Sequence, residues 1–358
     1  MSFKSQINHY RRTIMKALTG NIGNRFLAEK GKIDPNFKIN RVLICRPNQR
    51  LGNTLLITPL VQDIILFNPN VSIDLFVKGG VSHVIFENYP QINQIFKLPS
   101  KPFKELYKYL KIWFKIRSEN YDLVINVHEE SASGRIATKV SRSKFKLFGD
   151  EFIKDLNRDE QVHLGKIPVY QFRKFIEALT NVQSHSDFPK LNLKLSEYEI
   201  DYGKKILSEL IQDSSKETIA FFTYATGSKC YVAEWWDKFY LEFTNEFSNK
   251  YNLIEILPVE NISMLNRKLP TFYSQNIREI AAVIDNCSLL IAADSGMMHL
   301  GCATSTKNIG LFKSNNFKKY QPYGSGNCMY LVSDLTSDGL VEEMKEVLKI
   351  NVNNAHNL

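Results

Sequence analysis

The sequence has no apolar run long enough to cross a membrane and no export signal at its start. No stretch of eighteen consecutive apolar residues occurs, and a membrane-spanning helix needs about that many. The opening residues, MSFKSQINHYRR, lack the apolar core of a secretory signal. Together these absences predict a cytoplasmic chain.

Cysteine is scarce, and two familiar nucleotide-binding signatures are absent. The five cysteines are scattered and odd in number, with no CxxC pair: Cys45, Cys230, Cys287, Cys302 and Cys328. This pattern favours reduced, mostly buried thiols over a disulfide framework or a zinc site. The loop after the first predicted strand holds the single Gly52 and therefore fails GxGxxG, and no GxxxxGK[ST] run occurs.

Length and apolar content, by contrast, are ample, and the positive charge is uneven. The chain has 358 residues, 44% of them hydrophobic, enough for two domains with packed cores. Its net charge is +9, and residues 1–40 contribute +6 of it, from eight lysines and arginines against two acidic residues. A basic end suggests an anionic partner, such as a membrane surface, a nucleic acid or a phosphorylated glycolipid.

Strand and helix patterns alternate through both halves of the chain. Residues 7–26 have the spacing of one or two amphipathic helices. The first half then shows strand patterns at 41–46, 72–77, 94–98, 122–127 and 144–148, with helical patterns at 54–67 and 103–121. The second half shows strands at 218–224, 253–258, 288–294 and 308–312, with helices at 197–212, 233–248 and 339–350. Such alternation predicts parallel, doubly wound sheets.

The pattern also predicts how the chain divides. Ser196 and Glu199 form a capping box that opens the helix at 197, which restarts the alternation. The polar segment 184–196 marks the boundary. We expect a basic helical extension at 1–40, a first Rossmann-like domain at 41–190 and a second at 191–358, with the last helix a candidate to pack back on the first domain. A ligand-binding cleft between the two domains is expected.

The sharpest motif is AADSGMMHLGCA, residues 292–303. An apolar strand ends at Asp294, a tight turn follows at Ser295 and Gly296, and helix-forming residues come next. Free N–H groups at such a helix start bind phosphate, and Gly296 permits close approach. His299 lies four residues after Ser295 and so shares its side of the first turn. The alternative is an ordinary capped strand-to-helix turn.

Two further loops follow predicted strands and carry cations. In TYATGSK, residues 223–229, Lys229 closes a small donor-rich turn and could neutralise a leaving diphosphate. In CRPNQRLGNTLLITP, residues 45–59, Arg46 and Arg50 precede a helix and suggest anion contacts. For both loops, a purely structural or solvated role is the alternative.

In order and spacing these segments resemble glycosyltransferase family nine, the heptosyltransferases. Arg46 to Pro59 resembles the family's N-terminal motif, and YDLVINVHEESASGR (121–135) its "YDLVIDLHG…R" segment. Gly227 to Trp236 is similar to "GAS…KRW", with Lys229 at the lysine. DSGMMHL (294–300) is similar to "DSGPMHL", and Gln321 to Gly324 to the "GPYG" tail. The resemblance covers roughly residues 41–335.

The resemblance implies a GT-B fold, with two Rossmann-like domains facing a central cleft, the acceptor in the N-terminal half and the donor in the C-terminal half. It implies inverting, metal-independent transfer of a heptose from an ADP-linked donor to a lipopolysaccharide-core-like acceptor, with no cofactor beyond that co-substrate. The donor-binding residues it implies are Gly227, Ser228, Lys229, Asp294, Ser295, Gly296, Met297 and His299. Candidate acceptor-binding residues are Arg46, Arg50, Gly52, Asn53 and Arg135.

One position departs from the family. Its catalytic base is the aspartate after Leu-Gly, and here that position is Asn53, whose carboxamide cannot accept a proton near neutral pH. An inverting transfer needs a base near the acceptor hydroxyl. His128, Glu129 and Glu130 follow a predicted strand on the ligand-binding side and are candidate substitutes. The alternative for these three is an exposed polar loop.

The predicted helix at 103–117 is a second candidate contact for an anionic surface. Its apolar stripe comprises Phe103, Leu106, Tyr107, Leu110, Trp113 and Phe114, and Lys104, Lys108, Lys111 and Lys115 lie elsewhere on it. Basic amphipathic helices lie on anionic membranes, so this helix and the basic N-terminus suggest peripheral binding to the inner face of the cytoplasmic membrane. A core-packed helix is the alternative. No nucleic-acid motif accompanies the positive charge, so nucleic acid is not an expected partner.

Two alternative functions stay open. The same fold could use a different nucleotide-sugar donor, because the motifs address the diphosphate that all such donors share. A degenerate member could bind sugar nucleotide or glycan without transfer, because Asn53 replaces the base.

Overall fold

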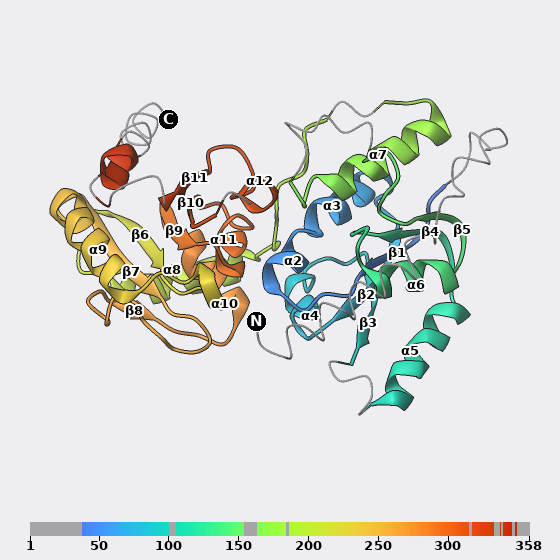
Figure 1. The fold of residues 1–358 in the computed structure, drawn as a ribbon, viewed down its shortest axis with the longest axis horizontal. Helices are drawn as coiled ribbons and strands as arrows, with labels where there is room; N and C mark the ends of the chain where they lie inside the picture. The colour runs from blue at the N-terminus through green and yellow to red at the C-terminus, as the bar shows by residue number, and fades with distance from the viewer. Residues whose placement is uncertain are drawn as a thin grey trace. The chain divides into compact units, whose positions relative to one another are not determined.

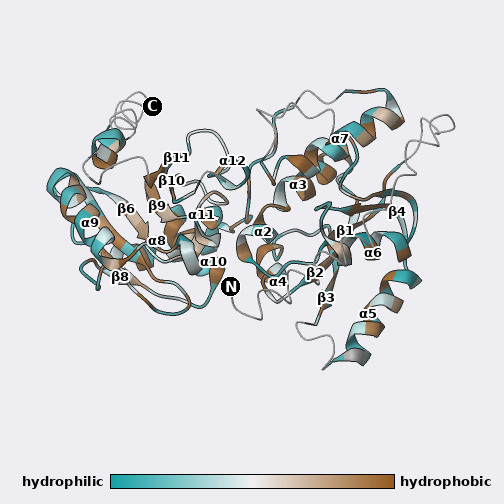
Figure 2. Cartoon of the chain, in the orientation of Figure 1, coloured by the Kyte–Doolittle hydropathy of each residue, from teal (hydrophilic) through white to brown (hydrophobic). Residues whose placement is uncertain are grey.

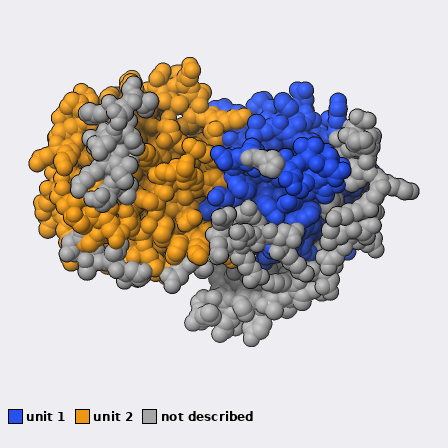
Figure 3. All heavy atoms as spheres, turned by 90° about the horizontal axis from the view of Figure 1, so that it is seen from above, with its two compact units in different colours: residues 1–189 blue, residues 190–358 orange. Residues whose placement is uncertain are grey.

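The computed structural model describes residues 38–99, 105–153, 163–183, 186–314, 317–332, 337, 339–345 and 348. The chain divides into two compact units, residues 1–189 and 190–358 (Figure 3). The helices expected at 7–26 and most of the extension expected at 1–40 lie outside the described residues.

The first unit holds a five-stranded sheet of order β3-β2-β1-β4-β5, in which every pair is parallel (Figure 1). Its strands are β1 (Arg41–Arg46), β2 (Ser72–Lys78), β3 (Ile92–Leu98), β4 (Asn120–Asn126) and β5 (Arg142–Leu147). Its helices are α2 (Leu51–Leu55), α3 (Thr58–Phe67), α4 (Val81–Ile85), α5 (Leu106–Ser118), α6 (Ala132–Val140) and α7 (Ile167–Thr180). Strands β1 and β2 are buried along almost their whole length, as expected of parallel strands covered on both faces.

The single helix expected at 54–67 is instead two helices, α2 and α3. Pro59 lies in the first turn of α3, where its missing N–H costs nothing, whereas inside a longer helix the ring would clash with the preceding turn. The apolar face of α3 is largely buried, and the helix is mostly brown in Figure 2. Helices α6 and α7 were not predicted.

Helix α5 has two apolar faces rather than one stripe. Trp113 packs against Phe76 with ring centroids 5.3 Å apart, and Ile116 is fully buried. Tyr107 and Phe114, by contrast, are 77% and 72% exposed. The prediction that Trp113 shares a stripe with these exposed side chains is wrong. Trp113 lies on the side of α5 that packs on the sheet, whereas Tyr107 and Phe114 face solvent.

The second unit holds a six-stranded sheet of order β11-β10-β9-β6-β7-β8, again with every pair parallel. Its strands are β6 (Glu217–Phe222), β7 (Tyr251–Ile256), β8 (Thr271–Phe272), β9 (Leu289–Ala293), β10 (Lys307–Phe312) and β11 (Cys328–Leu331). Its helices are α8 (Glu197–Leu210), α9 (Ala233–Phe247), α10 (Ile277–Asp285), α11 (Gly296–Gly301) and α12 (Phe317–Tyr320), and residues 339–345 are also helical.

Local signals and packing agree in this unit. The capping box predicted at Ser196 and Glu199 is present. Four aromatic side chains of α9 are buried in the core beside the strands: Trp236, Phe239, Phe243 and Phe247. Helix α10 and strands β8 and β11 were not predicted.

The predicted architecture of two doubly wound parallel sheets is confirmed. In each sheet the strand order reverses at one point, between β1 and β4 in the first unit and between β6 and β9 in the second. Loops at the carboxyl ends of strands flanking such a reversal form the usual ligand crevice of this fold. None of the helices that the structure describes has the length and apolar character needed to cross a membrane.

Candidate functional site

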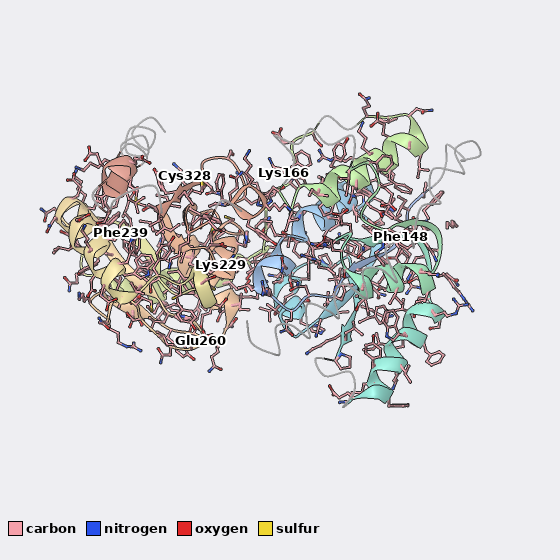
Figure 4. All side chains as sticks on the ribbon, viewed as in Figure 1. Phe148, Lys166, Lys229, Phe239, Glu260 and Cys328 are labelled. Carbon is pink, nitrogen blue, oxygen red and sulfur yellow. The ribbon has the colours of Figure 1, made fainter. Side chains whose placement is uncertain are left out.

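The reversal point of the second sheet brings together Lys229 and Asp294, which the sequence motifs had singled out separately. The loop after β6 carries Lys229, and β9 ends just before Asp294. The Lys229 ammonium lies 2.5 Å from Asp294 Oδ2 and 5.6 Å from the centre of the Tyr320 ring. The lysine side chain is 47% exposed and the aspartate 12%, so this ion pair is partly open to solvent. Lys229 is labelled in Figure 4.

A tight turn delivers Lys229 to this position. Residues Gly227–Lys229 form one 3₁₀ turn, and Cys230 N donates to Gly227 O at 3.2 Å. Gly227 has a φ of +67°, while an added Cβ would meet nothing within 4 Å. The turn therefore needs glycine for its backbone conformation rather than for space. Gly227, Ser228 and Lys229 are all exposed.

On the other side, Ser295 begins α11 without capping it. Its backbone is extended, with φ −147° and ψ 173°, and its side chain makes no capping hydrogen bond. Ser295 Oγ is buried and has no hydrogen-bond partner among the residues described. The first N–H groups of α11 are thus not capped by Ser295. Gly296 and Met297 are partly exposed, whereas His299 is only 4% exposed.

A second lysine, which the sequence analysis did not single out, lies at the same edge of the sheet. Lys313 directly follows β10, and its ammonium donates to Cys230 O at 2.7 Å. It also lies 4.6 Å from the centre of the Tyr231 ring. Tyr231 is buried, and this burial together with the neighbouring Asp294 carboxylate raises the pKa of its hydroxyl. The position of Lys313 just past a predicted strand was the available signal.

A buried carboxylate fixes the neighbouring loop between β7 and β8. Glu255 on β7 is fully buried and accepts from Thr223 Oγ1 at 2.6 Å and from Ser263 Oγ at 2.5 Å. Met264 N donates to Thr223 Oγ1 at 3.3 Å. Burial raises the pKa of Glu255. These bonds tie the loop that carries the exposed Glu260 to the end of β6, directly before the Lys229 turn.

In the first unit, the loop after β1 joins Arg46 to Asn53. Arg46 Nη2 donates to Asn53 Oδ1 at 3.1 Å, and Arg46 is only 8% exposed. Because a guanidinium can only donate, it directs the amide oxygen toward itself, and the amide NH₂ is the group that Asn53 can offer elsewhere. Arg50 is exposed and Gly52 is buried in α2. Asn53 therefore presents a donor at the position where the family has its base.

The candidate substitute bases lie in the loop after β4, across the reversal point of the same sheet. Glu130 N donates to His128 Nδ1 at 3.1 Å. With that nitrogen accepting, the proton of the neutral imidazole resides on Nε2, which is then a donor. Glu129 and Glu130 are exposed. When ionised, their carboxylates can only accept hydrogen bonds.

Two buried groups brace this loop against the loop after β5. Arg135 is 3% exposed, and its Nη1 lies 3.0 Å from Asp150 Oδ2. Asn126 Nδ2 donates to His128 O at 2.8 Å and to Phe148 O at 2.7 Å. A Cβ on Gly134, in α6, would lie 2.0 Å from Asn126 Oδ1. An acceptor-binding role for Arg135 stays a prediction, and its contacts favour a structural one.

The chain is similar to known glycosyltransferases in sequence over one segment and in fold over most of its length. Residues 274–345 match the model of glycosyltransferase family 9 (heptosyltransferase). A glycosyl transferase family 9 protein from Veillonella parvula is 16% identical with a TM-score of 0.66, over 89% of this chain and 98% of that one. The Escherichia coli ADP-heptose lps heptosyltransferase II is 14% identical with a TM-score of 0.60, over 87% and 99%. The E. coli heptosyltransferase WaaC with ADP is 16% identical with a TM-score of 0.62, over 86% and 99%.

No curated protein sequence matches the chain. The family match confirms the resemblance to glycosyltransferase family nine, and the solved structures show that the fold is shared. The matched residues include all of β9, all of α11 and Lys313.

Proposed function

We propose that this chain is a glycosyltransferase that moves a sugar, a heptose, from an ADP-linked donor to a lipopolysaccharide-core-like acceptor. The match to a glycosyltransferase family supports the enzyme class. The observation that carries the proposal is the meeting of Lys229 with the start of α11 at the reversal point of the second sheet. An ammonium beside the first N–H groups of a helix that Ser295 does not cap suits a departing diphosphate.

The second unit would bind the donor. Gly227 and Ser228 lie in an exposed turn whose N–H groups can approach phosphate oxygens, and Lys229 supplies charge. Residues 294–297 supply the start of α11, and His299 is buried in the same helix. On transfer, negative charge builds on the oxygen that leaves the anomeric carbon, and these donors stabilise it in place of a metal ion. Attack by the acceptor hydroxyl from the opposite face gives inversion.

The first unit would bind the acceptor. Arg46 and Arg50 suit a phosphorylated or acidic glycan, with Gly52 and Asn53 beside them and Arg135 behind the loop. Asn53 would donate to the acceptor through its NH₂ group. The proton of the acceptor hydroxyl would pass to Glu129 or Glu130, with His128 as a hydrogen-bond donor.

A binding role without transfer is the second candidate function, and Asn53 motivates it, because Arg46 holds its carboxamide as a donor rather than a base. Comparing Asn53→Asp with the native chain separates the two. Turnover by both the native chain and the Asp variant would mean that the catalytic base is a residue other than position 53. Turnover by the Asp variant alone would make the native protein a binder.

Thermal-shift screening with ADP, UDP, GDP and CMP tests the donor. A ligand at a hundredfold its Kd stabilises the folded chain by about 2.7 kcal/mol. A selective rise in melting temperature with ADP supports the proposed donor. A selective rise with another nucleotide would favour a different nucleotide sugar, and no rise with any of the four would refute the transferase.

We further propose that the protein works in the cytoplasm on the inner face of the membrane, where a lipid-anchored acceptor lies. Tyr107, Leu110 and Phe114 follow one exposed face of α5 and are 77%, 48% and 72% exposed. Lys111 and Lys115 are exposed beside them. An apolar face with lysines beside it suits an anionic bilayer.

Sedimentation with phosphatidylglycerol vesicles tests this contact. Phe114→Ser should reduce the bound fraction. Tyr198→Ser, which removes a 78% exposed aromatic from α8 in the second unit, is the control and should not. Equal binding by both variants would count against α5 as the contact.

A further inference from the structure

We propose that Lys313 supplies the net positive charge that binds the diphosphate of the donor. This inference rests on the proposed function and concerns the same edge of the second sheet. The ligand class is a nucleoside diphosphate, free or carrying a sugar. The family motifs did not include Lys313, and its role is inferred from its contacts.

The charges at this edge distinguish the two lysines. Lys229 is paired with the Asp294 carboxylate at 2.5 Å, so the pair carries no net charge. Lys313 contacts neutral groups, the Cys230 carbonyl at 2.7 Å and the Tyr231 ring at 4.6 Å. Within the described part of the chain, no carboxylate forms an ion pair with Lys313. Lys313 is therefore a cation at this edge whose charge is offset by no carboxylate among the described residues.

The strand order places Lys313 beside the end of β9, the strand that leads into α11. Strand β9 lies between β10 and β6, and Asp294 N donates to Leu311 O of β10 at 3.0 Å. Lys313 comes two residues after Leu311, and its side chain reaches Cys230, the neighbour of Lys229. The ammonium thus links the loops on the two sides of β9, the strand that leads into α11. A diphosphate bound over the carboxyl end of β9 would therefore meet this ammonium.

The present contacts of Lys313 are also easy to exchange. The hydrogen bond to Cys230 O is charge-assisted only at the ammonium, whereas one to a phosphate oxygen would be charge-assisted at both ends. The carbonyl of Cys230 offers only a dipole. The Tyr231 ring can hold the ammonium by a cation–π contact while its partner changes. Lys229 can donate to a phosphate oxygen while it keeps Asp294, because an ammonium has three N–H donors, but the pair as a whole adds no net positive charge.

The test is calorimetric titration of ADP into the full chain at low ionic strength. Lys313→Gln should bind ADP about 10- to 100-fold more weakly than wild type, the loss of one charge-assisted hydrogen bond. Lys313→Arg keeps the charge and should retain most of the affinity. Lys204→Gln, which removes an exposed lysine from α8, is the charge-matched control and should bind as wild type.

The outcomes separate the two proposals. Wild type that binds neither ADP nor UDP, GDP or CDP would refute the proposed function and this inference with it. Wild type that binds ADP while Lys313→Gln binds equally well would refute the role of Lys313 alone. An equal loss in Lys313→Gln and Lys204→Gln would show a general charge effect and would also refute it. Melting temperatures of all variants check that each is folded.

Discussion

Replacing Lys229 by glutamine should separate catalysis from stability. The ammonium pairs with Asp294 at 2.5 Å, but its side chain is 47% exposed, and ion pairs this exposed stabilise a fold by no more than about 1 kcal/mol. The same charge facing a leaving diphosphate is worth far more. Removing one such donor typically costs about 2.7–4 kcal/mol in the transition state, a 10²- to 10³-fold fall in kcat.

The assay measures nucleoside diphosphate release at saturating donor and acceptor, together with urea unfolding of the same preparation. Lys268→Gln is a matched control in the same unit. Lys268 pairs with Asp237 at 2.7 Å, is 42% exposed and lies 5.8 Å from the Tyr240 ring. Both variants should lose similar, small amounts of stability, and only Lys229→Gln should lose turnover.

Two results would refute this reasoning. An unchanged kcat in Lys229→Gln would make the pair with Asp294 a surface ion pair without a role in transfer. A loss of turnover that tracks a large loss of stability would mean that the pair holds the fold together, which its exposure argues against.

Three further predictions concern stability. Burial raises the pKa of Glu255 above its ordinary 4.5. Between 4.5 and this raised pKa, the folded chain therefore binds more protons than the unfolded chain. The free energy of unfolding falls as the pH rises through that window. Glu255→Gln should abolish this slope in urea titrations at a series of pH values, and a slope identical to wild type would contradict it. Arg278 lowers the pKa of Glu199 from 4.5 to about 2, which is worth roughly 3 kcal/mol of stability above pH 4.5. That contribution is lost as the pH falls toward 2, so Glu199→Gln should be less stable than wild type at neutral pH and converge with it in acid, and a constant difference would count against the ion pair. Gly134→Ala should cost about 1–3 kcal/mol, because its Cβ would lie 2.0 Å from Asn126 Oδ1, and an unchanged melting temperature would show that the loop yields.

What could be predicted from the sequence was local. The apolar run that ends at Asp294 and the glycine turn before Lys229 each follow from neighbouring residues, and strand–helix alternation suffices for the two doubly wound sheets. The break between α2 and α3 was also readable, since Pro59 cannot lie inside one long helix. The capping box at Ser196 is of the same kind.

What could not be predicted depends on which strands are neighbours. Lys313 reaches the loop after β6 only because β10 and β6 lie in one sheet with just β9 between them. Arg135 is committed to Asp150 because β5 lies beside β4. The orientation of the Asn53 carboxamide comes from the Arg46 guanidinium, seven residues earlier, to which its oxygen is hydrogen-bonded. None of these relations leaves a periodic trace in the chain.

The tight fit of Gly134 against Asn126 bears on how variation in this chain should be interpreted. Any side chain at position 134 collides with the Asn126 side chain at the end of β4, whether or not the protein transfers sugar. Selection for folding alone would therefore keep glycine there, and its invariance among descendants would say nothing about chemistry. Position 313 is exposed and free of that constraint. A library screened first for expression and then for donor turnover should fix 134 in the first round and 313 only in the second.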